Sequence, residues 1–336
     1  MHTVVLPDLA VPLAPLTTLR LGGPARRLVD AETADEVVEA LREPALVIGG
    51  GSNLVIADEG WPGTVVRIST RGRRVERRPD GSVLLTVEAG EEWDDVVAAT
   101  VADGLGGLEC LSGIPGRTGA VPVQNVGAYG VEIADALVDV DLLAGGVVRR
   151  VPAADLGLAY RTSVLKGRSD AVVLRVRIAL PGDALSAPVR YAELARALGV
   201  APGERVPAAV AREAVLALRR GKGMVLDPAD HDTWSAGSFF TNPVLATAPP
   251  GAPAWPVGDR FKVSAAWLIE HAGFRRGYPG PGGRVALSGR HVLALTHRGG
   301  GSTADLLALA AEVRDGVAAR FGVALTPEPV LVGCSL

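Results

Sequence analysis

The stretch GLECLSGIPGRTGAVPVQNVGAYG, residues 107–130, decides how the fold is interpreted. Its part from 112 to 130 contains five glycines and two prolines, but no Asp, Glu or Lys. A solvated connection usually carries charge, and long irregular segments are uncommon in compact domains unless they bind something. The composition therefore favours an ordered binding loop over a long solvated connection.

The hydrogen-bonding side chains of this loop are Ser112, Thr118, Gln124 and Asn125. Together with exposed backbone N–H groups, they suit a flat, polar cofactor that carries phosphates. We therefore expect the loop to wrap such a cofactor.

A second glycine-rich segment, VIGGGSNL, covers residues 47–54 and follows a short apolar run. It lacks the dinucleotide fingerprint, because Leu54 stands where the third glycine would be, and no Gly-Lys-Ser/Thr follows. Three consecutive glycines let backbone N–H groups turn toward an anion. A tight structural turn and a diphosphate cradle both remain open for this segment.

Hydrophobic periodicity outward from these loops predicts alternating strands and helices in the first third of the chain, as in a layered α/β arrangement, then mostly strands from about 83 to 180, and helices again after about 207. Predicted helices cover about 33–42, 93–104, 208–221, 264–273 and 303–320, and predicted strands cover 45–48, 64–69, 83–89, 136–144, 147–152, 171–180, a pair within 285–297, and 323–333. The basic run RGRRVERRPDG, residues 71–81, precedes a turn signal and is interpreted as a solvated hairpin.

Length and composition restrict the class of protein. The chain has 336 residues, which suggests two or three domains, and a net charge of −3, which argues against a general nucleic-acid binder. It has no apolar run long enough for a membrane span, and its start shows no secretory signal, so we expect a cytoplasmic protein without membrane association. The two cysteines, Cys110 and Cys334, have no partners at metal-ligand spacing, so no metal is expected.

The stretch TWSAGSFFTNP, residues 233–243, surrounds Ser238 with small residues on one side and two phenylalanines on the other. Taken alone, it is typical of a strand end that turns at Asn-Pro. A site residue is the alternative interpretation of Ser238.

Six segments in order then indicate a family: TTLRLGGPA, GGGSNLVI, SGIPGRTGAVPVQNVGAYG, YRTSVLK, AGSFFTNP and TPEPVLVG. From about Pro15 to Gly333 the chain resembles the UDP-N-acetylenolpyruvoylglucosamine reductases (MurB). These flavoenzymes reduce the enolpyruvyl ether of a nucleotide sugar to UDP-N-acetylmuramate, a peptidoglycan precursor.

The resemblance implies an α+β fold, which combines an FAD-binding fold of the vanillyl-alcohol oxidase (PCMH) type in two domains with an α+β substrate-binding domain. The implied boundaries are 1–75 with 322–336, then 76–205, and 206–321 for the substrate domain. It also implies non-covalent FAD, NADPH as hydride donor and UDP-N-acetylglucosamine enolpyruvate as substrate. We expect a monomer.

The resemblance assigns three catalytic residues. Arg161 would hold the substrate carboxylate with its planar fork, and Glu328 would share in stabilising the enol-like intermediate. Ser238 would deliver the proton to C2 after hydride from FAD N5 reaches C3. In this interpretation the small neighbours of Ser238 make room for substrate, and the phenylalanines exclude water.

The resemblance also implies binding residues. For FAD these are Gly49, Gly50, Gly51, Ser52, Asn53, Leu54, Ser112, Ile114, Pro115, Gly116, Gly119, Gln124, Asn125, Gly127, Ala128 and Tyr129. For the substrate they are Tyr160, Tyr191, Lys222, Asn242, Arg276 and His291, with Tyr191 in a loop that closes on the nucleotide.

The chain departs from many relatives at Thr296-His297 and in a longer connection between Lys222 and Ser238, which could displace Lys222. Two rival functions are an FAD-dependent sugar or alcohol oxidase of the same fold and a binding protein without turnover. The two glycine-rich segments contain no histidine for covalent flavin attachment, and all three catalytic residues are present, so reduction of an unsaturated acid is favoured.

Overall fold

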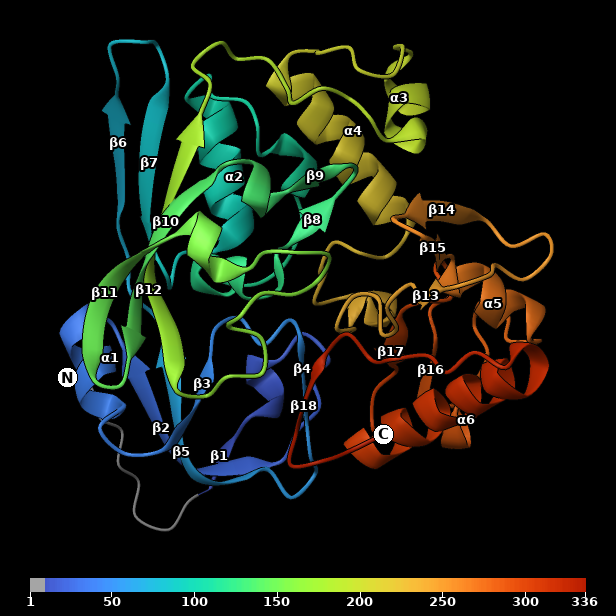
Figure 1. Cartoon of the computed structure of the whole chain (residues 1–336). Helices are drawn as coiled ribbons and strands as arrows, with labels where there is room; N and C mark the ends of the chain where they lie inside the picture. Colours follow the sequence, from blue (N-terminus) through green and yellow to red (C-terminus); the bar gives the residue numbers. More distant parts are fainter. Residues whose placement is uncertain (1–9) are drawn as a thin grey trace. The chain divides into compact units, whose positions relative to one another are not determined.

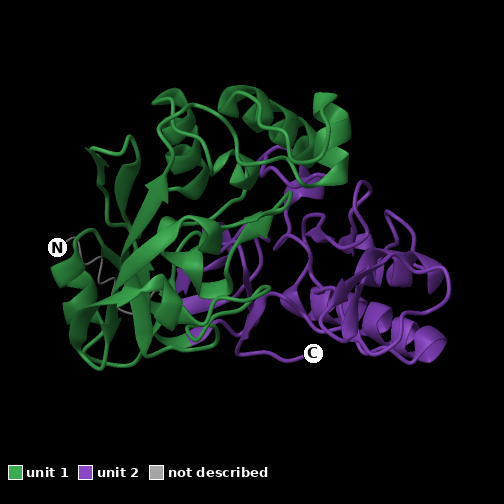
Figure 2. Ribbon diagram, turned by 45° about the horizontal axis from the view of Figure 1, so that its top comes forward, with its two compact units in different colours: residues 1–10, 26–50, 62–221 green, residues 11–25, 51–61, 222–336 purple. Residues whose placement is uncertain are grey.

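The computed structural model describes residues 10–336, which divide into two compact units (Figure 2). The first unit comprises residue 10 and residues 26–50 and 62–221, and the second comprises residues 11–25, 51–61 and 222–336. The three-part division expected from the family stays a prediction, and residues 1–9 of its first part lie outside the described chain.

The main sheet of the first unit is antiparallel (Figure 1). Its strands follow the order β11 (Val147–Pro152), β10 (Leu137–Ala144), β12 (Ala171–Leu180), β7 (Val83–Glu88) and β6 (Arg73–Arg77). The edge strand β6 pairs with β7 across a turn, so the predicted basic hairpin is confirmed. Charged side chains on an edge strand disfavour pairing with other chains.

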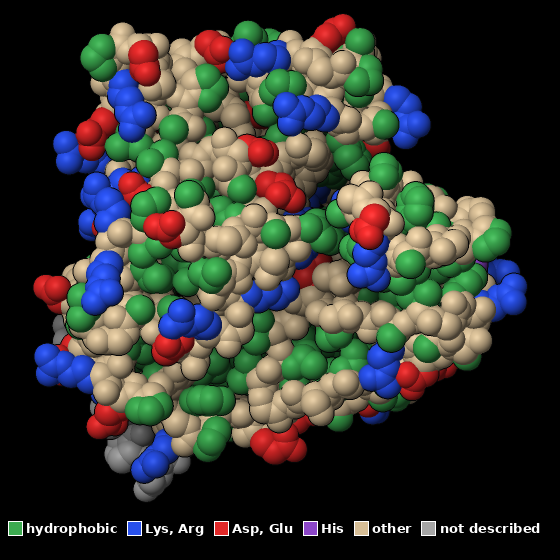
Figure 3. All heavy atoms as spheres, viewed as in Figure 1, with side chains coloured by type: hydrophobic (Ala, Val, Ile, Leu, Met, Phe, Trp, Pro, Cys, Tyr) green, Lys and Arg blue, Asp and Glu red, His purple; other side chains and the backbone are tan. Residues whose placement is uncertain are grey.

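Arginines inside β12 are matched by acidic residues on β10. Arg177, which is buried, donates to Asp139 at 2.6 Å and to Asp141 at 2.9 Å. Alternation along both strands brings these charges to one face of the sheet, where each buried charge has a partner. Over the visible surface, Lys and Arg side chains are likewise interspersed with Asp and Glu (Figure 3).

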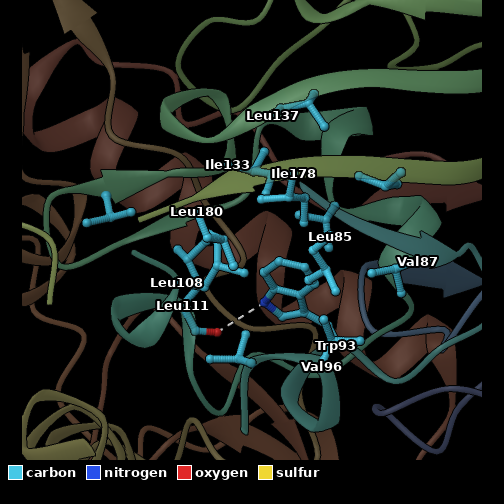
Figure 4. Packing of buried hydrophobic residues seen from close by; sticks show 14 of the residues in the cluster. Leu85, Val87, Trp93, Val96, Leu108, Leu111, Ile133, Leu137, Ile178 and Leu180 are labelled. Carbon is cyan, nitrogen blue, oxygen red and sulfur yellow. Dashed lines mark hydrogen bonds between the residues drawn. The ribbon is translucent and has the colours of Figure 1, made fainter. Parts of the chain in front are cut away.

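The core of the first unit gathers around Trp93 at the start of α2 (Trp93–Ala102) (Figure 4). Trp93 is fully buried, and its Nε1 donates to the Leu111 carbonyl at 3.1 Å. Because the indole N–H has a partner, its burial leaves no unpaired donor, and truncation to alanine would cost roughly 3–5 kcal/mol. Cys110 packs in the same core. The remaining helices of the unit are α1 (Ala34–Ala40), α3 (Ala192–Leu198) and α4 (Ala208–Gly221).

A smaller sheet follows the order β1 (Val11–Pro12), β2 (Pro24–Ala31), β5 (Trp61–Ile68) and β3 (Ala45–Ile48). Strands β3 and β5 are parallel, and α1 packs Val37 against this layer. Thr33 and Glu36 form a capping box at the start of α1, where the sequence predicts a helix. The first unit also holds the short pair β8 (Gly127–Ala128) and β9 (Val131–Glu132).

The second unit is built around α6 (Thr303–Phe321). Its strands are β4 (Leu54–Ile56), β13 (Val244–Leu245), β14 (Ala254–Val257), β15 (Arg260–Val263), β16 (Val285–Leu287), β17 (Leu295–His297) and β18 (Val330–Val332), and its other α-helix is α5 (Ala265–His271). The apolar side of α6 is fully buried, as the sequence predicts, through Leu306, Leu309, Val313 and Val317.

The terminal strand is shorter than predicted. The sequence predicts a strand over 323–333, but β18 begins only at Val330, where it pairs in parallel with β4. Pro327 and Pro329 lack the N–H that a regular ladder requires, so regular pairing starts after them. No helix within residues 10–336 combines the length and apolarity that crossing a membrane requires.

Candidate active site

The glycines at the end of β3 are required by close packing. A Cβ on Gly50 would lie 2.7 Å from the Cα of Gly116, and one on Gly51 would lie 2.0 Å from the Leu16 carbonyl oxygen. Gly51 also has a positive φ of 58°. The tight turn, one of the two alternatives that the sequence left open, is therefore present, and Gly50 brings this turn against the second glycine-rich loop.

Arg117 lies at the contact between these two loops. A Cβ on Gly49 would lie 3.2 Å from the Arg117 Cβ. The Arg117 guanidinium donates to the Gly90 carbonyl at 2.7 Å and pairs with Glu92 at 3.0 Å. Its buried Nε has no hydrogen-bond partner within residues 10–336.

An unpaired buried donor beside glycine backbone fits a phosphate-bearing cofactor such as FAD. Sequence reasoning did not assign Arg117 a role, although it is the one charged residue between 111 and 130.

Polar side chains inside the 112–130 loop hold the loop itself. Asn125 donates to Glu132 at 2.7 Å and to the Ala159 carbonyl at 3.2 Å, and its Oδ1 accepts from the Ala134 amide at 3.1 Å. Ser112 is fully buried and donates to the Glu109 carbonyl at 2.6 Å. The loop is ordered, as predicted, and these two side chains act within the protein.

Helix α4 and α2 fix the loop at Gly113. Its amide donates to Asp94 at 2.7 Å, and Asp94 also accepts from Arg212 at 2.7 Å. Arg219 donates to the Gly113 carbonyl at 3.2 Å. Burial lowers the pKa of Arg219, and the nearby Tyr129 and Asp94 oppose that shift. Sequence reasoning missed these anchors, because the spacing of α4 indicates only an amphipathic helix.

Residues with a strained backbone are concentrated in the predicted site. Within residues 10–336 five non-glycine residues have positive φ, and three of them are predicted site residues: Asn125 at 46°, Tyr129 at 51° and Arg161 at 55°. This conformation costs on the order of 1 kcal/mol or more for each such residue, and it concentrates at functional sites. The clustering supports a functional role for this part of the first unit.

Arg161 is anchored to the GAYG turn. Its Nη2 donates to the Gly127 carbonyl at 2.7 Å, and its own carbonyl accepts from Lys166 Nζ at 3.0 Å. The guanidinium also lies 5.4 Å from the centre of the Tyr160 ring. A planar cation held in this way is oriented before any carboxylate arrives.

The segment before α3 packs on the same turn. The Tyr191 and Tyr129 rings meet edge to face with centroids 5.5 Å apart. Burial raises the pKa of Tyr129 to about 12, so its hydroxyl stays protonated near neutral pH. Tyr191 is exposed and immediately precedes α3.

Two of the three predicted catalytic residues lie on adjacent segments of the second unit. The Glu328 amide donates to the Phe239 carbonyl at 2.8 Å, and the Thr241 amide donates to the Thr326 carbonyl at 3.1 Å. The segment that follows Ser238 therefore pairs with the segment that holds Glu328. Arg161 belongs to the first unit.

The two phenylalanines after Ser238 are core residues. Phe239 and Phe240 are both buried, and their rings meet edge to face with centroids 5.1 Å apart. The Phe239 amide also donates to the Leu293 carbonyl at 2.7 Å. These contacts fix the segment in the interior, while Ser238 itself is half-buried.

The longer connection before Ser238 folds back on itself. Gly223, next to Lys222, has a φ of 66°, and a Cβ there would lie 3.2 Å from the Asp232 carbonyl oxygen. The chain following Lys222 thus returns to the segment that leads to Ser238. Asn242 accepts from the Ala265 amide at 2.9 Å, so part of its side chain supports the start of α5. Of the other predicted substrate residues, Arg276 is exposed, and the His291 amide donates to Ser288.

Comparison with known proteins decides the family. The family description "FAD binding domain" matches residues 25–151, and "UDP-N-acetylenolpyruvoylglucosamine reductase, C-terminal domain" matches residues 227–332. The chain is 63% identical to the UDP-N-acetylenolpyruvoylglucosamine reductase of Saccharopolyspora erythraea, over 96% of this chain and 95% of that protein. The chain belongs to the UDP-N-acetylenolpyruvoylglucosamine reductase family.

Further relatives agree with this family. The reductase of Salinispora arenicola is 54% identical over 99% of this chain and 97% of that protein. The crystal structure of the reductase (MurB) from Thermus caldophilus superposes with a TM-score of 0.69 at 28% identity, covering 96% of this chain and 98% of that one. The predicted α+β fold with an FAD-binding domain and the prediction of an oxidoreductase are confirmed.

Proposed function

We propose that this chain uses NADPH to reduce UDP-N-acetylglucosamine enolpyruvate to UDP-N-acetylmuramate. When bound by the two glycine-rich segments, FAD would supply the redox chemistry that carries hydride from NADPH to C3 of the enolpyruvyl group. The protein acts as a cytoplasmic monomer in peptidoglycan precursor synthesis. Support comes from the family to which the chain belongs and from the fit of its glycine-rich loops to a phosphate-bearing cofactor.

Each catalytic side chain has one role in this proposal. Arg161 binds the substrate carboxylate and lowers the energy of the charge that develops there. Glu328 acts on the same carboxylate in its protonated or hydrogen-bonded form. Ser238 donates its hydroxyl proton to C2.

The observation that carries the proposal is the backbone pairing of the Ser238 and Glu328 segments. The Glu328 amide bonds the Phe239 carbonyl at 2.8 Å, and Phe239 is directly next to Ser238. A proton donor and an acidic residue on paired, core-anchored segments are held in fixed register. The anchoring of Arg161 by the Gly127 carbonyl supports its role in the same way.

The binding residues are proposed in two groups. Gly49 to Leu54 and the 112–129 loop residues named above would hold FAD, with Arg117 added beside Gly49. Ser112 and Asn125 would contribute by shaping the loop, because their side chains bond within the protein. Tyr160, Tyr191, Lys222, Asn242, Arg276 and His291 would bind the nucleotide sugar.

The test separates the two half-reactions without oxygen. NADPH, and NADH in parallel, is added to the purified yellow protein until the flavin absorbance bleaches, and the enolpyruvyl sugar nucleotide is then mixed in by stopped flow. Ser238→Ala should slow the return of absorbance by roughly 10²–10⁴-fold and leave bleaching by NADPH within about twofold of wild type. Ser335→Ala, the same change at an exposed site of the same unit, is the matched control.

Other outcomes assign other functions. If only oxygen restores the absorbance, the chain is an oxidase of the same fold. If Ser238→Ala slows both half-reactions equally, Ser238 is a binding residue instead of the proton donor.

A further inference from the structure

The TTLRLGGPA segment, residues 17–25, has no role in the proposal above, yet its two threonines are buried. Thr17 is 3% exposed and Thr18 is 5% exposed. Buried hydroxyl groups are nearly always hydrogen-bonded, so the hydrogen-bond partners of these two residues indicate what the segment does.

Thr18 contacts two of the site segments at once. Its Oγ1 donates to the Ser235 carbonyl at 2.7 Å, and its amide donates to the Gly51 carbonyl at 3.3 Å. Gly51 is packed so closely here that a Cβ would lie 2.8 Å from the Thr17 Cα. One residue therefore joins the end of the glycine turn to the chain three residues before Ser238, and all of these residues belong to the second unit.

The turn that carries Thr18 is itself fixed. The Thr17 hydroxyl lies 3.0 Å from the Leu21 carbonyl and 3.1 Å from the Ala14 carbonyl, and the Arg20 amide donates to the Thr17 carbonyl at 3.2 Å. Arg20 has a positive φ of 56°, which closes the turn. Thr18 is thus presented from a rigid support.

The Ser235 carbonyl is a sensitive point of the serine segment. Ser235 is buried, forms a bridge with Thr296, and accepts at its Oγ from the Gly237 amide at 3.2 Å. Gly237 then turns the chain with a φ of 71°. A shift at Ser235 therefore passes to Ser238 over three residues before the bond from the Phe239 amide fixes the chain again.

We propose that Thr18 is a positioning residue for the proton-transfer step: its hydroxyl holds the Ser235 carbonyl and so sets the placement of Ser238 relative to the glycine turn at Gly51. The inference rests on the function proposed for Ser238. Thr18 itself touches neither substrate nor cofactor in this role. Loss of its hydroxyl leaves the buried Ser235 carbonyl without this donor, and small misplacements at a reacting group cost large factors in rate.

The test uses full-length, FAD-loaded Thr18→Val, which keeps the side-chain shape and removes the hydroxyl. Transfer to the enolpyruvyl sugar nucleotide should slow by about 10–100-fold, with KM and flavin reduction by NADPH changed less than about threefold. A larger solvent deuterium isotope effect on the second half-reaction should accompany the loss. Thr18→Ser, which keeps the hydroxyl, should stay within about threefold of wild type, and Thr247→Val at an exposed site is the matched control.

Hydrogen exchange gives a readout that is independent of turnover. In Thr18→Val the Phe239 amide should exchange faster, while the amides of α6 keep their wild-type rates. Equal losses in both half-reactions, loss of FAD, or a wild-type rate in Thr18→Val would each overturn the inference, and so would a slow Thr18→Ser. If the wild type fails to reduce the sugar nucleotide while Phe239 exchange still responds, the proposed function fails, and Thr18 remains a support of this segment.

Discussion

Asp232→Ala should strongly destabilise the second unit. Asp232 is 7% exposed, and its carboxylate accepts three hydrogen bonds: from Ser288 Oγ at 2.8 Å, from the Gly289 amide at 2.9 Å and from Arg298 Nη2 at 2.6 Å. The alanine variant leaves all three donors without this acceptor. These bonds tie the segment before Ser238 to the hairpin of β16 and β17, so their loss acts at the centre of the unit.

The magnitude follows from the burial of each partner. Breaking a buried charge pair costs about 3–5 kcal/mol, and a hydrogen bond to a charged group contributes about 1.5–3 kcal/mol. The Arg298 side chain is 30% exposed, so water recovers part of its loss. We therefore expect the free energy of unfolding to fall by about 3 kcal/mol, or the melting temperature by roughly 6–12 °C.

Urea unfolding followed by circular dichroism measures this loss, with the melting temperature as a second readout. Asp315→Ala is the control, because Asp315 is 64% exposed and pairs only with its neighbour Arg314 among the described ion pairs. The control should unfold like wild type. Asp232→Asn, which keeps the side-chain shape and one acceptor oxygen, should unfold at a urea concentration between those of Asp232→Ala and wild type. If Asp232→Ala and the control unfold at the same urea concentration, the buried network contributes nothing, and the reasoning is refuted.

Three further predictions concern titration and helix capping. Burial lowers the pKa of His297 below its ordinary value of 6.5, so unfolding lets it bind a proton and the free energy of unfolding falls as pH drops below about 6.5. Urea titrations at about pH 7.5 and 5.5 should show a smaller drop in His297→Gln, and equal drops would contradict the prediction. Burial raises the pKa of Asp94, but hydrogen bonds, led by the one from Arg212, outweigh it and hold this pKa below its ordinary 3.8. Asp94→Asn should lower the free energy of unfolding by about 1 kcal/mol at neutral pH. Thermal unfolding should show that this difference from wild type disappears in acid, where the wild-type carboxyl is protonated. A difference that stays constant with pH would argue against the Asp94–Arg212 pair. Asp58 accepts from the Thr303 and Ala304 amides at 2.8 and 2.9 Å, so Asp58→Ala should lower the free energy of unfolding by about 1 kcal/mol in the same assay, and an unchanged value would mean that water replaces this cap.

Local signals in the sequence predict most elements correctly. The Ser302 and Asp305 capping box begins α6 where the sequence places it, and the same holds for Thr33 in α1. Such signals act within one helical turn, so they can be recognised without the rest of the chain. Helix α3 and strands such as β2, β4 and β13–β15 are not among the predicted elements. The terminal strand is shorter than predicted, because its prolines remove donors that the apolar pattern alone does not register.

The candidate site also has features that the sequence indicates and features that it does not. The order of the glycine-rich and serine segments indicates the family, and the comparisons confirm it. The sequence does not indicate that the Asn125 side chain bonds Glu132, Ala134 and Ala159 outside its loop, nor that Arg117 keeps a buried donor with no partner within residues 10–336. Both depend on which groups the folded chain brings within hydrogen-bonding distance.

The sequence by itself determined most of the helices, the strands of the main sheet, the ordered motifs and hence the family, because each depends on residues a few positions apart. Only the tertiary structure decided which distant segments meet. Thr18 bonds Ser235 across 217 residues of sequence, and Glu328 pairs its backbone with Phe239. No local pattern encodes these contacts, because they form only when the whole core packs and each buried polar group takes the partner that packing places beside it.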